Sequence, residues 1–220
     1  MALSEVFIPS YCQIALFFSE GCNLKVLSAA EEFIKNFRGV FSKEPIVNPS
    51  SKNVNLPRIT LVENDVGQLS VSNVRADLYL FLNKNLGLND VPKMANLFAR
   101  CFSIKDIINF GLLCVYDVDR NISISDIKNQ YVLSNKFSGI SDFQISWARK
   151  VSVDICDIAM AKRFVNFCAS ENGGCYFIVD HNTKSNVTCR FNVSDDIEEL
   201  ARLFLKHLES DLYDTLEWKR

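Results

Sequence analysis

The chain has 220 residues, of which 48% are hydrophobic and 23% are charged, and its formal net charge at pH 7 is −2. This composition is typical of a folded globular protein and excludes a largely disordered chain. The small negative charge argues against a nucleic-acid-binding protein, because such proteins usually carry a basic excess that replaces the counterions of the phosphate backbone.

The first 21 residues do not have the pattern of a secretory signal. They lack a basic segment, and Glu5 and Pro9 interrupt their apolar run. No stretch of the chain reaches the ~18–20 consecutive apolar residues that cross a bilayer. The sequence therefore predicts a cytoplasmic protein that makes no contact with a membrane.

Eight cysteines are the unusual feature of the composition, and no two of them are spaced as in C-x-x-C. Structural zinc sites usually take their ligands in such close pairs, so the spacing does not favour a zinc site. In a reducing compartment, a cysteine among large apolar neighbours is usually buried and unreactive. This interpretation applies to four of the eight: Cys101, Cys114, Cys156 and Cys168.

In the first half of the chain, the dense apolar run at residues 11–18 predicts a buried strand. Apolar residues at helical spacing then predict an amphipathic helix within residues 24–41, in which Ser28 and Glu31 fit a capping box. The inward residues of this helix are expected to be Leu27, Ala30, Ile34, Phe37 and Phe41. Residues 42–57 contain three prolines and three serines and predict an exposed loop.

The hydrophobic period then changes to two, which predicts a run of three strands. These strands lie within residues 58–64, 67–73 and 76–83. A helix is expected within residues 89–102, where an Asn/Asp cap precedes a proline in the first turn, followed by a short helical turn before residue 107. Residues 111–119 predict the next buried strand.

The second half of the chain predicts a strand at residues 142–155, a helix at residues 157–170 and a hairpin with arms at 175–181 and 187–193. The inward residues of the helix are expected to be Met160, Phe164, Phe167 and Cys168. A long amphipathic helix with an acidic first turn follows over residues 194–218. Its apolar stripe is predicted to consist of Ile197, Leu200, Ala201, Phe204, Leu208 and Leu212.

The order of elements in both halves resembles the split β-α-β arrangement. We therefore predict an α+β protein of two tandem ferredoxin-like lobes, residues 1–120 and residues 121–220, with a long C-terminal helix. Because the strands occur in runs with helices between the runs, the sheets are expected to be largely antiparallel.

The segment 173–196 contains Cys175, His181 and Cys189, which raises the question of a metal site or a thiol nucleophile with its base. In a regular strand, Cys175 and His181 lie roughly 20 Å apart, too far to share a metal ion or a proton. Cys189 can approach His181 only as a diagonal neighbour across the turn, and His181 is interpreted as a loop residue. The sequence therefore favours an ordinary hairpin with both thiols on the core-facing side.

His207 has a possible orienting partner in Asp211, one helical turn later. Such pairs are common on helix surfaces and contribute little. No candidate nucleophile lies near His207 in the sequence, so the pair does not predict a catalytic site.

Asp117 and Asp119 follow an apolar strand two residues apart, and so their side chains are expected on one face. Carboxylates in this arrangement can hold Mg²⁺ in phosphoryl- or nucleotidyl-transferring enzymes. A third carboxylate is then needed, for which Asp154 or Asp180 is a candidate. The alternative interpretation is that the two aspartates end the strand and begin the next turn.

The sequence contains no catalytic constellation that outweighs a structural explanation. The first hypothesis is therefore a non-enzymatic binding or regulatory protein without a cofactor, a subunit or adaptor of a protein complex that binds a protein partner or itself. The alternative hypothesis is a Mg²⁺-dependent phosphoryl- or nucleotidyl-transferring enzyme that uses Asp117 and Asp119. A further alternative is a small-molecule sensor whose ligand lies between the two lobes.

Overall fold

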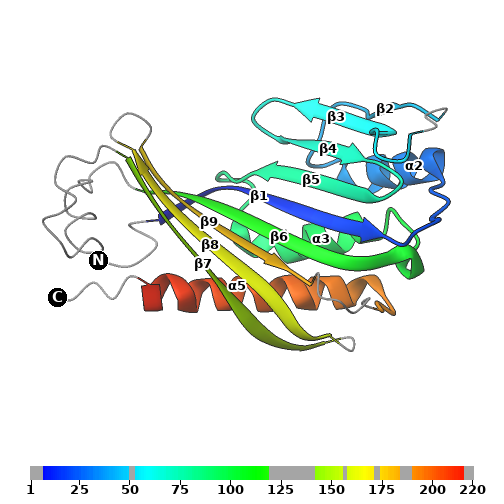
Figure 1. The fold of residues 1–220 in the computed structure, drawn as a ribbon. Coiled ribbons are helices and arrows are strands. Elements are labelled where there is room, and N and C mark those ends of the chain that lie inside the picture. Colours follow the sequence, from blue (N-terminus) through cyan, green and yellow to red (C-terminus); the bar gives the residue numbers. More distant parts are fainter. Residues whose placement is uncertain are drawn as a thin grey trace, which may run out of the picture.

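The computed structural model describes residues 7–49, 53–118, 142–155, 158–170, 174–183 and 190–215. Within these ranges the protein is an α+β structure with one sheet, whose strand order is β2-β3-β4-β5-β1-β6-β9-β8-β7 (Figure 1). Every neighbouring pair of strands is antiparallel, as the sequence predicts. Among the described residues, no helix is long and apolar enough to span a membrane.

Six strands and two α-helices come from the first part of the chain. The strands are β1 (Phe7–Phe18), β2 (Ile46–Val47), β3 (Ile59–Glu63), β4 (Gly67–Val71), β5 (Arg75–Phe81) and β6 (Ile107–Val118). The helices are α2 (Val26–Phe37) and α3 (Val91–Ala99), with short 3-10 turns at Leu88–Asp90 and Ile104–Asp106. Except for β2, which lies within the loop predicted at residues 42–57, these elements correspond to those that the hydrophobic periods predict.

The later part of the chain contributes β7 (Asp142–Ile155), β8 (Ile158–Ser170), β9 (Gly174–Asn182) and α5 (Ser194–Thr215). The predicted helix at residues 157–170 is wrong, because this segment is the strand β8. It pairs with β7 along its length and with β9 from Lys162 onward. In β8, the buried Ala161 and Arg163 alternate with the exposed Lys162 and Phe164, which is the period of a strand.

The two halves of the chain share one sheet. β6 pairs with β1 on one side and with β9 on the other, so hydrogen bonds run continuously from β2 to β7. Two tandem ferredoxin-like lobes, each with its own sheet, are therefore not confirmed. The predicted boundary between residues 120 and 121 lies outside the described residues.

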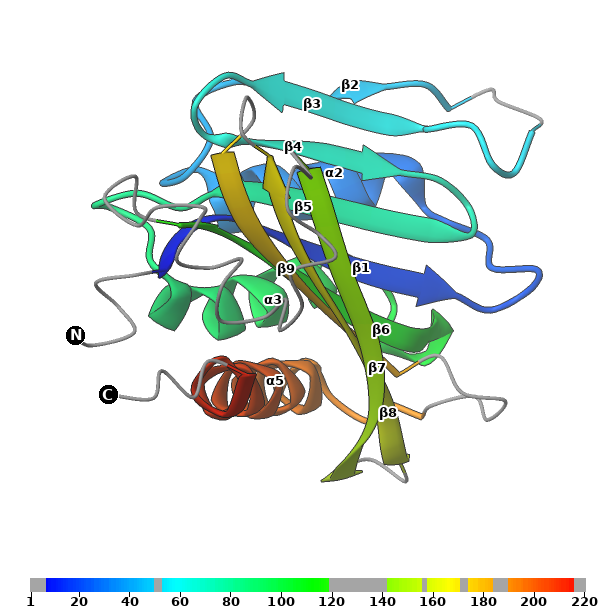
Figure 2. The same ribbon diagram turned by 60° about the vertical axis from the view of Figure 1, so that its left-hand side comes forward.

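The helices α2, α3 and α5 lie on one face of the sheet (Figures 1 and 2). The buried side of α2 consists of Val26, Ala29, Ala30, Phe33 and Phe37. Leu27 and Ile34, predicted to face inward, are instead exposed, because the face that carries Phe33 is the one that packs on the sheet. The predicted capping box is also wrong: α2 begins at Val26, so Ser28 lies inside the helix, and no side chain caps its first turn.

On the helix-covered face, one row of directly paired residues crosses the sheet and changes character along its length. It consists of Leu61, Leu69, Leu78, Ile14, Leu112, His181 and Arg163, all buried. The first five are aliphatic, and the polar pair lies in β9 and β8. Phe204 of α5 stacks on the His181 ring with 4.8 Å between ring centroids. Next to α5, this row therefore contains the polar side chains of His181 and Arg163, whereas its other side chains are aliphatic.

Four predicted core residues of α5 are confirmed as fully buried: Ile197, Leu200, Ala201 and Phe204. Cys101 and Cys114 are buried as predicted. Cys156 lies outside the described residues, and the side chain of Cys168 is not described.

A buried amide joins α3 to the start of α5. Asn96 Nδ2 donates to Asp195 Oδ1 at 2.8 Å and to Glu198 Oε2 at 2.7 Å, while Arg100 Nε donates to Asn96 Oδ1 at 2.8 Å. The hydrogen bonds from Asn96 and Arg202 hold the pKa of Glu198 below its ordinary value. The side chain of Asn96 thus makes three hydrogen bonds at the α3–α5 contact.

The variant Asn96→Ala is expected to lower the free energy of unfolding by about 2 kcal/mol, because it removes hydrogen bonds to charged groups from a buried position. Urea unfolding followed by circular dichroism measures this change. Asn89→Ala is the control, because Asn89 is exposed. Equal losses for both variants would contradict the stabilising role of the Asn96 amide.

Candidate functional site

The second face of the sheet carries no helix among the described residues (Figure 2). Its central row of directly paired residues crosses eight strands, from β3 to β7. This row consists of Val62, Gln68, Tyr79, Gln13, Leu113, Asp180, Phe164 and Ala148. Each of these residues follows or precedes a residue of the helix-covered face, so the strand alternation assigns them to the opposite side. We call this surface the helix-free face.

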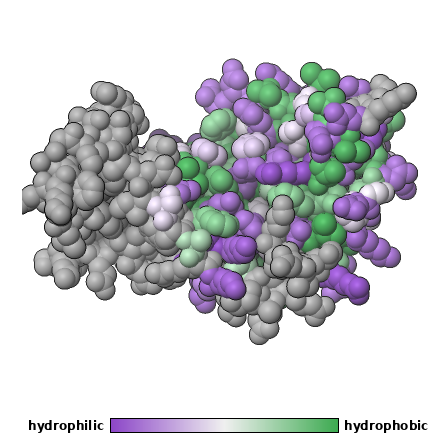
Figure 3. Space-filling model, in the orientation of Figure 1, coloured by the Kyte–Doolittle hydropathy of each residue, from purple (hydrophilic) through white to green (hydrophobic). Residues whose placement is uncertain are grey.

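The helix-free face exposes large apolar side chains. Among the described residues, eleven large hydrophobic side chains are exposed, and five of them project from this face. They are Ile8, Ile46, Val62, Phe81 and Phe164. Ile46 is 74% exposed. Figure 3 shows hydrophobic and hydrophilic residues side by side over the described part of the molecule in one view.

A polar cluster occupies the part of the helix-free face formed by β5 and β1. Gln13 Nε2 donates to Asp77 Oδ1 at 2.7 Å, and Arg75 Nη2 lies 2.7 Å from the same oxygen. The Arg75 guanidinium also lies 4.8 Å from the centre of the Phe17 ring. These contacts hold Arg75 and Asp77 in place, so this part of the face has a defined polar pattern.

Asp180 lies on the same face in β9, directly between Leu113 and Phe164. Burial raises the pKa of the Asp180 carboxyl, while the charge of Arg75 and a hydrogen bond from Asn182 oppose this effect. The raised pKa indicates that neighbouring side chains of the sheet partly shield the Asp180 carboxyl from water, although no described helix covers this face.

Two lysines face each other at the β7–β8 end of the helix-free face. Lys150 and Lys162 are a directly paired cross-strand couple, and both are exposed. Like charges directly opposite each other are destabilising within a sheet. Phe164 and Ala148 follow in the next row and are also exposed. This end of the face therefore combines positive charge with apolar surface.

The residues of the predicted Mg²⁺ site are described only in part. Asp117 is exposed near the end of β6, where it pairs in register with Ile8 and Tyr176. Asp119 lies outside the described residues, and the side chain of Asp154 in β7 is not described. No group of three or more His, Cys, Asp or Glu side chains in the described ranges is placed to hold a metal ion. The Mg²⁺-dependent alternative stays a prediction.

The hairpin predicted for segment 173–196 is only partly present. Its first arm is β9, which contains Cys175 and His181, so His181 is a strand residue and not a loop residue. In the second arm, Cys189 lies outside the described residues, and residues 190–193 do not form a strand. His181 is 0% exposed, and neither of its ring nitrogens has a hydrogen-bond partner in the structure. Sequence analysis did not predict that His181 is buried. The signal for this was the position of His181 within an apolar strand.

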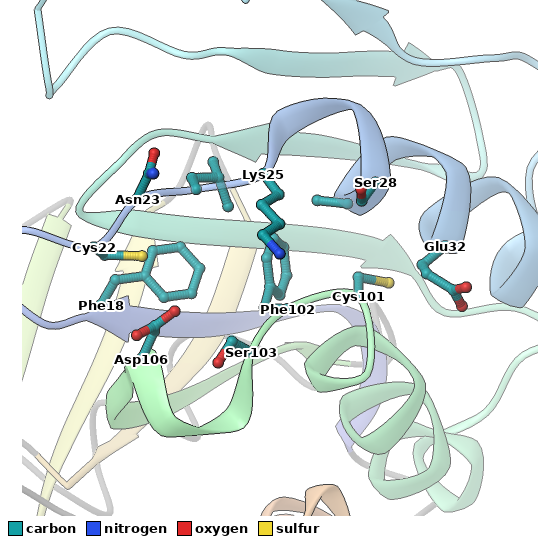
Figure 4. A pocket seen from close by; sticks show the side chains of 12 residues that line it. Phe18, Cys22, Asn23, Lys25, Ser28, Glu32, Cys101, Phe102, Ser103 and Asp106 are labelled. Carbon is teal, nitrogen blue, oxygen red and sulfur yellow. The ribbon is translucent and has the colours of Figure 1, made fainter.

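A cavity of about 350 Å³ lies on the helix-covered side, where the end of β1, the start of α2 and the loop after α3 meet (Figure 4). Its apolar wall includes Phe18, Leu24 and Phe102. Its polar side chains are Cys22, Asn23, Lys25, Ser28, Glu32, Cys101, Ser103 and Asp106. Sequence analysis did not find this cavity, because its residues come from three separate segments.

Both thiols in the cavity are protonated at neutral pH. Burial raises the pKa of Cys22 to about 11, and the charge of Asp106 and its hydrogen bond with Cys22 add to this effect. Burial likewise raises the pKa of Cys101 to about 12, against the opposing hydrogen bond from Asn36. Because the thiolate is the nucleophile, these side chains are suited to contact a ligand and not to attack it.

The helix-free face and the cavity are thus two candidate binding surfaces in the described part of the chain. They lie on opposite sides of the sheet and share no residue. In comparisons with known proteins, no family model matches the chain, and neither a curated protein nor a solved structure matches it.

Proposed function

We propose that the protein is a non-enzymatic binding module, a subunit or adaptor of a protein complex, which binds its partner with the helix-free face. The observation that carries this proposal is the set of five exposed apolar side chains on a sheet face that no helix of the described residues covers. A sheet normally buries its apolar face against a second layer, and apolar groups gathered on an open surface mark interaction sites.

The charge of the face supports a particular chemistry for the partner. Lys150 and Lys162 lie directly opposite each other, which costs stability unless negative charge approaches them. Phe164 lies beside them and supplies an apolar contact. The partner is therefore expected to be a protein segment with apolar side chains and neighbouring carboxylates, which pair with the two lysines.

The variant Phe81→Asp/Phe164→Asp is expected to abolish capture of the partner by the tagged protein, because it places two charges in the apolar part of the interface. Capture from cells of the source organism is quantified by mass spectrometry for the wild type, this variant and Ile34→Asp. Ile34 is exposed to a similar extent as Phe164, 37% against 39%, but lies on α2. Ile34→Asp is therefore expected to capture the partner normally.

A captured protein supports the proposal only if its purified form binds the purified wild type and not the face variant. Lys150→Gln/Lys162→Gln is expected to weaken this binding about tenfold or more and to reduce its salt dependence. Light scattering of the purified wild type tests whether the partner is a second copy of the chain. A monomeric wild type whose captured proteins are the same as those of the face variant would overturn the proposal.

A further inference from the structure

The cavity at the start of α2 brings together opposite charges that lack ion-pair partners. Lys25 and Asp106 both line it, and neither forms an ion pair with another described residue. Figure 4 shows the Lys25 side chain extending from the start of α2 toward Phe102, with Asp106 on one side and Glu32 on the other. Glu32 already pairs with Lys35 at 3.3 Å. The two charges that remain for a ligand are therefore one ammonium and one carboxylate.

The rest of the wall is suited to an apolar group. Phe18 and Phe102 pack against each other with 5.1 Å between ring centroids, and Leu24 and Ala29 lie beside them. The volume of about 350 Å³ is near the lower end of the roughly 300–1,000 Å³ that small-molecule sites occupy. A ligand with one charge of each sign and a compact apolar part satisfies all of these groups together.

The start of α2 also favours a ligand carboxylate close to Lys25. α2 begins at Val26 with no side-chain cap and no acidic residue in its first turn. The positive end of this helix is therefore available to a carboxylate that pairs with Lys25. Asp106 is held by its own backbone, since its N–H donates to Ser103 O and its carbonyl accepts from Ser19 N. The Cys22 thiol donates a hydrogen bond to the Asp106 carboxylate, which orients this group at the wall of the cavity.

We propose that this cavity binds a free amino acid with a large apolar side chain, whose carboxylate pairs with Lys25 and whose ammonium pairs with Asp106. The side chain of the ligand packs on Phe18 and Phe102. This site is within the first half of the chain and not between two lobes, and it is independent of the partner surface on the helix-free face. The protein then combines a small-molecule site with a separate surface for a protein partner.

The proposal is tested by calorimetry at pH 7 with three probes of the same shape. L-Phenylalanine carries both charges, phenethylamine lacks the carboxylate, and 3-phenylpropanoate lacks the ammonium. We expect L-phenylalanine, or another member of a panel of the twenty amino acids, to bind with a Kd of about 1 mM or lower. Each analogue that lacks one charge is expected to bind at least about tenfold more weakly, because a charged hydrogen bond is lost.

Two variants separate the two charges. Lys25→Met is expected to weaken L-phenylalanine about tenfold without changing the affinity for phenethylamine, which has no carboxylate. Asp106→Asn is expected to weaken L-phenylalanine without changing the affinity for 3-phenylpropanoate. Lys105→Met and Glu20→Gln are the matched controls, since both residues are exposed and neither lines the cavity. Circular dichroism checks that all four variants are folded.

Three results overturn the proposal. The first is that none of the twenty amino acids binds. The second is equal affinity for the three probes, which indicates apolar partition without recognition of charge. The third is that Lys105→Met changes the affinities as much as Lys25→Met. None of these results bears on the partner surface, which is tested with Phe81 and Phe164 variants.

Discussion

Lowering the pH from 6.5 toward 3 is expected to reduce the free energy of unfolding, with His181 as a principal cause. Burial, together with the positive charges of Arg163 and His207, lowers the pKa of His181 from 6.5 to about 3. The unfolded chain binds a proton at His181 below pH 6.5, whereas the folded protein binds it only near pH 3. Stability is therefore complete above pH 6.5 and is lost as the pH falls, by at most about 1.4 kcal/mol for each pH unit.

The variant His181→Phe isolates this contribution. Phenylalanine keeps an aromatic ring for the stack on Phe204 and removes two buried nitrogens that have no hydrogen-bond partner. At pH 7 the variant is expected to match the wild type within about 1 kcal/mol, because an apolar replacement of similar shape is nearly neutral there. At pH 4.5 it is expected to be more stable than the wild type by about 3 kcal/mol.

Urea unfolding of both proteins at pH 7.0, 6.0, 5.0 and 4.5 measures the difference. The informative quantity is the difference in free energy of unfolding between the wild type and the variant. Carboxylates also titrate in this pH range, but they affect both proteins equally. The charged and titratable groups that act on His181 are Arg163 on β8 and His207 on α5. Parallel stability curves for wild type and variant would show that His181 does not titrate differently in the two states.

Replacing Gly67 by alanine is expected to destabilise the protein by about 3 kcal/mol or more. A Cβ at this position would overlap the backbone carbonyl oxygen of Tyr79 in the paired strand β5 and would lie 3.1 Å from Cζ of Phe41. The obstacle is backbone, which cannot rotate away as a side chain does, so β4 and β5 must separate locally. A loss of this size exceeds that of most single substitutions.

Gly111→Ala is the matched control for Gly67→Ala. Gly111 is also a strand glycine, in β6, but its Cβ would meet only ordinary contacts, with the Cβ of Ala15 at 3.6 Å. Gly111→Ala is expected to be neutral or to stabilise the protein by about 0.5 kcal/mol, because alanine loses less backbone entropy on folding. Urea unfolding at pH 7 compares both variants with the wild type. Similar losses for the two would contradict the steric explanation.

The strands and helices of the first half could be predicted from the sequence, because each has a strong local period. The alternation in residues 58–83 depends only on neighbouring side chains, and β3, β4 and β5 form there. The buried face of α2 was displaced from the prediction, since both candidate faces of that helix are apolar. Tertiary packing made the choice between them, because Phe33 and Phe37, which stack on each other within α2, are buried in the core of the protein.

The strand β8 could not be predicted in the same way. Its apolar residues fit a helix at least as well as a strand, and short segments of this kind are ambiguous by period alone. Pairing with β7 on one side and β9 on the other decides in favour of the strand. The same pairing places Arg163 beside His181, which no local pattern indicates.

The sequence by itself determined the α+β character, the antiparallel strand runs and most core residues, because these depend on the spacing of apolar side chains along a few turns or strands. Only the tertiary structure decided that both halves share one sheet, that the described helices all lie on one face of it, and that His181 is buried. These features come from hydrogen bonds and contacts between segments far apart in the chain, such as β6 with β9. Their free energy depends on which strands meet, and local periodicity carries no information about that choice.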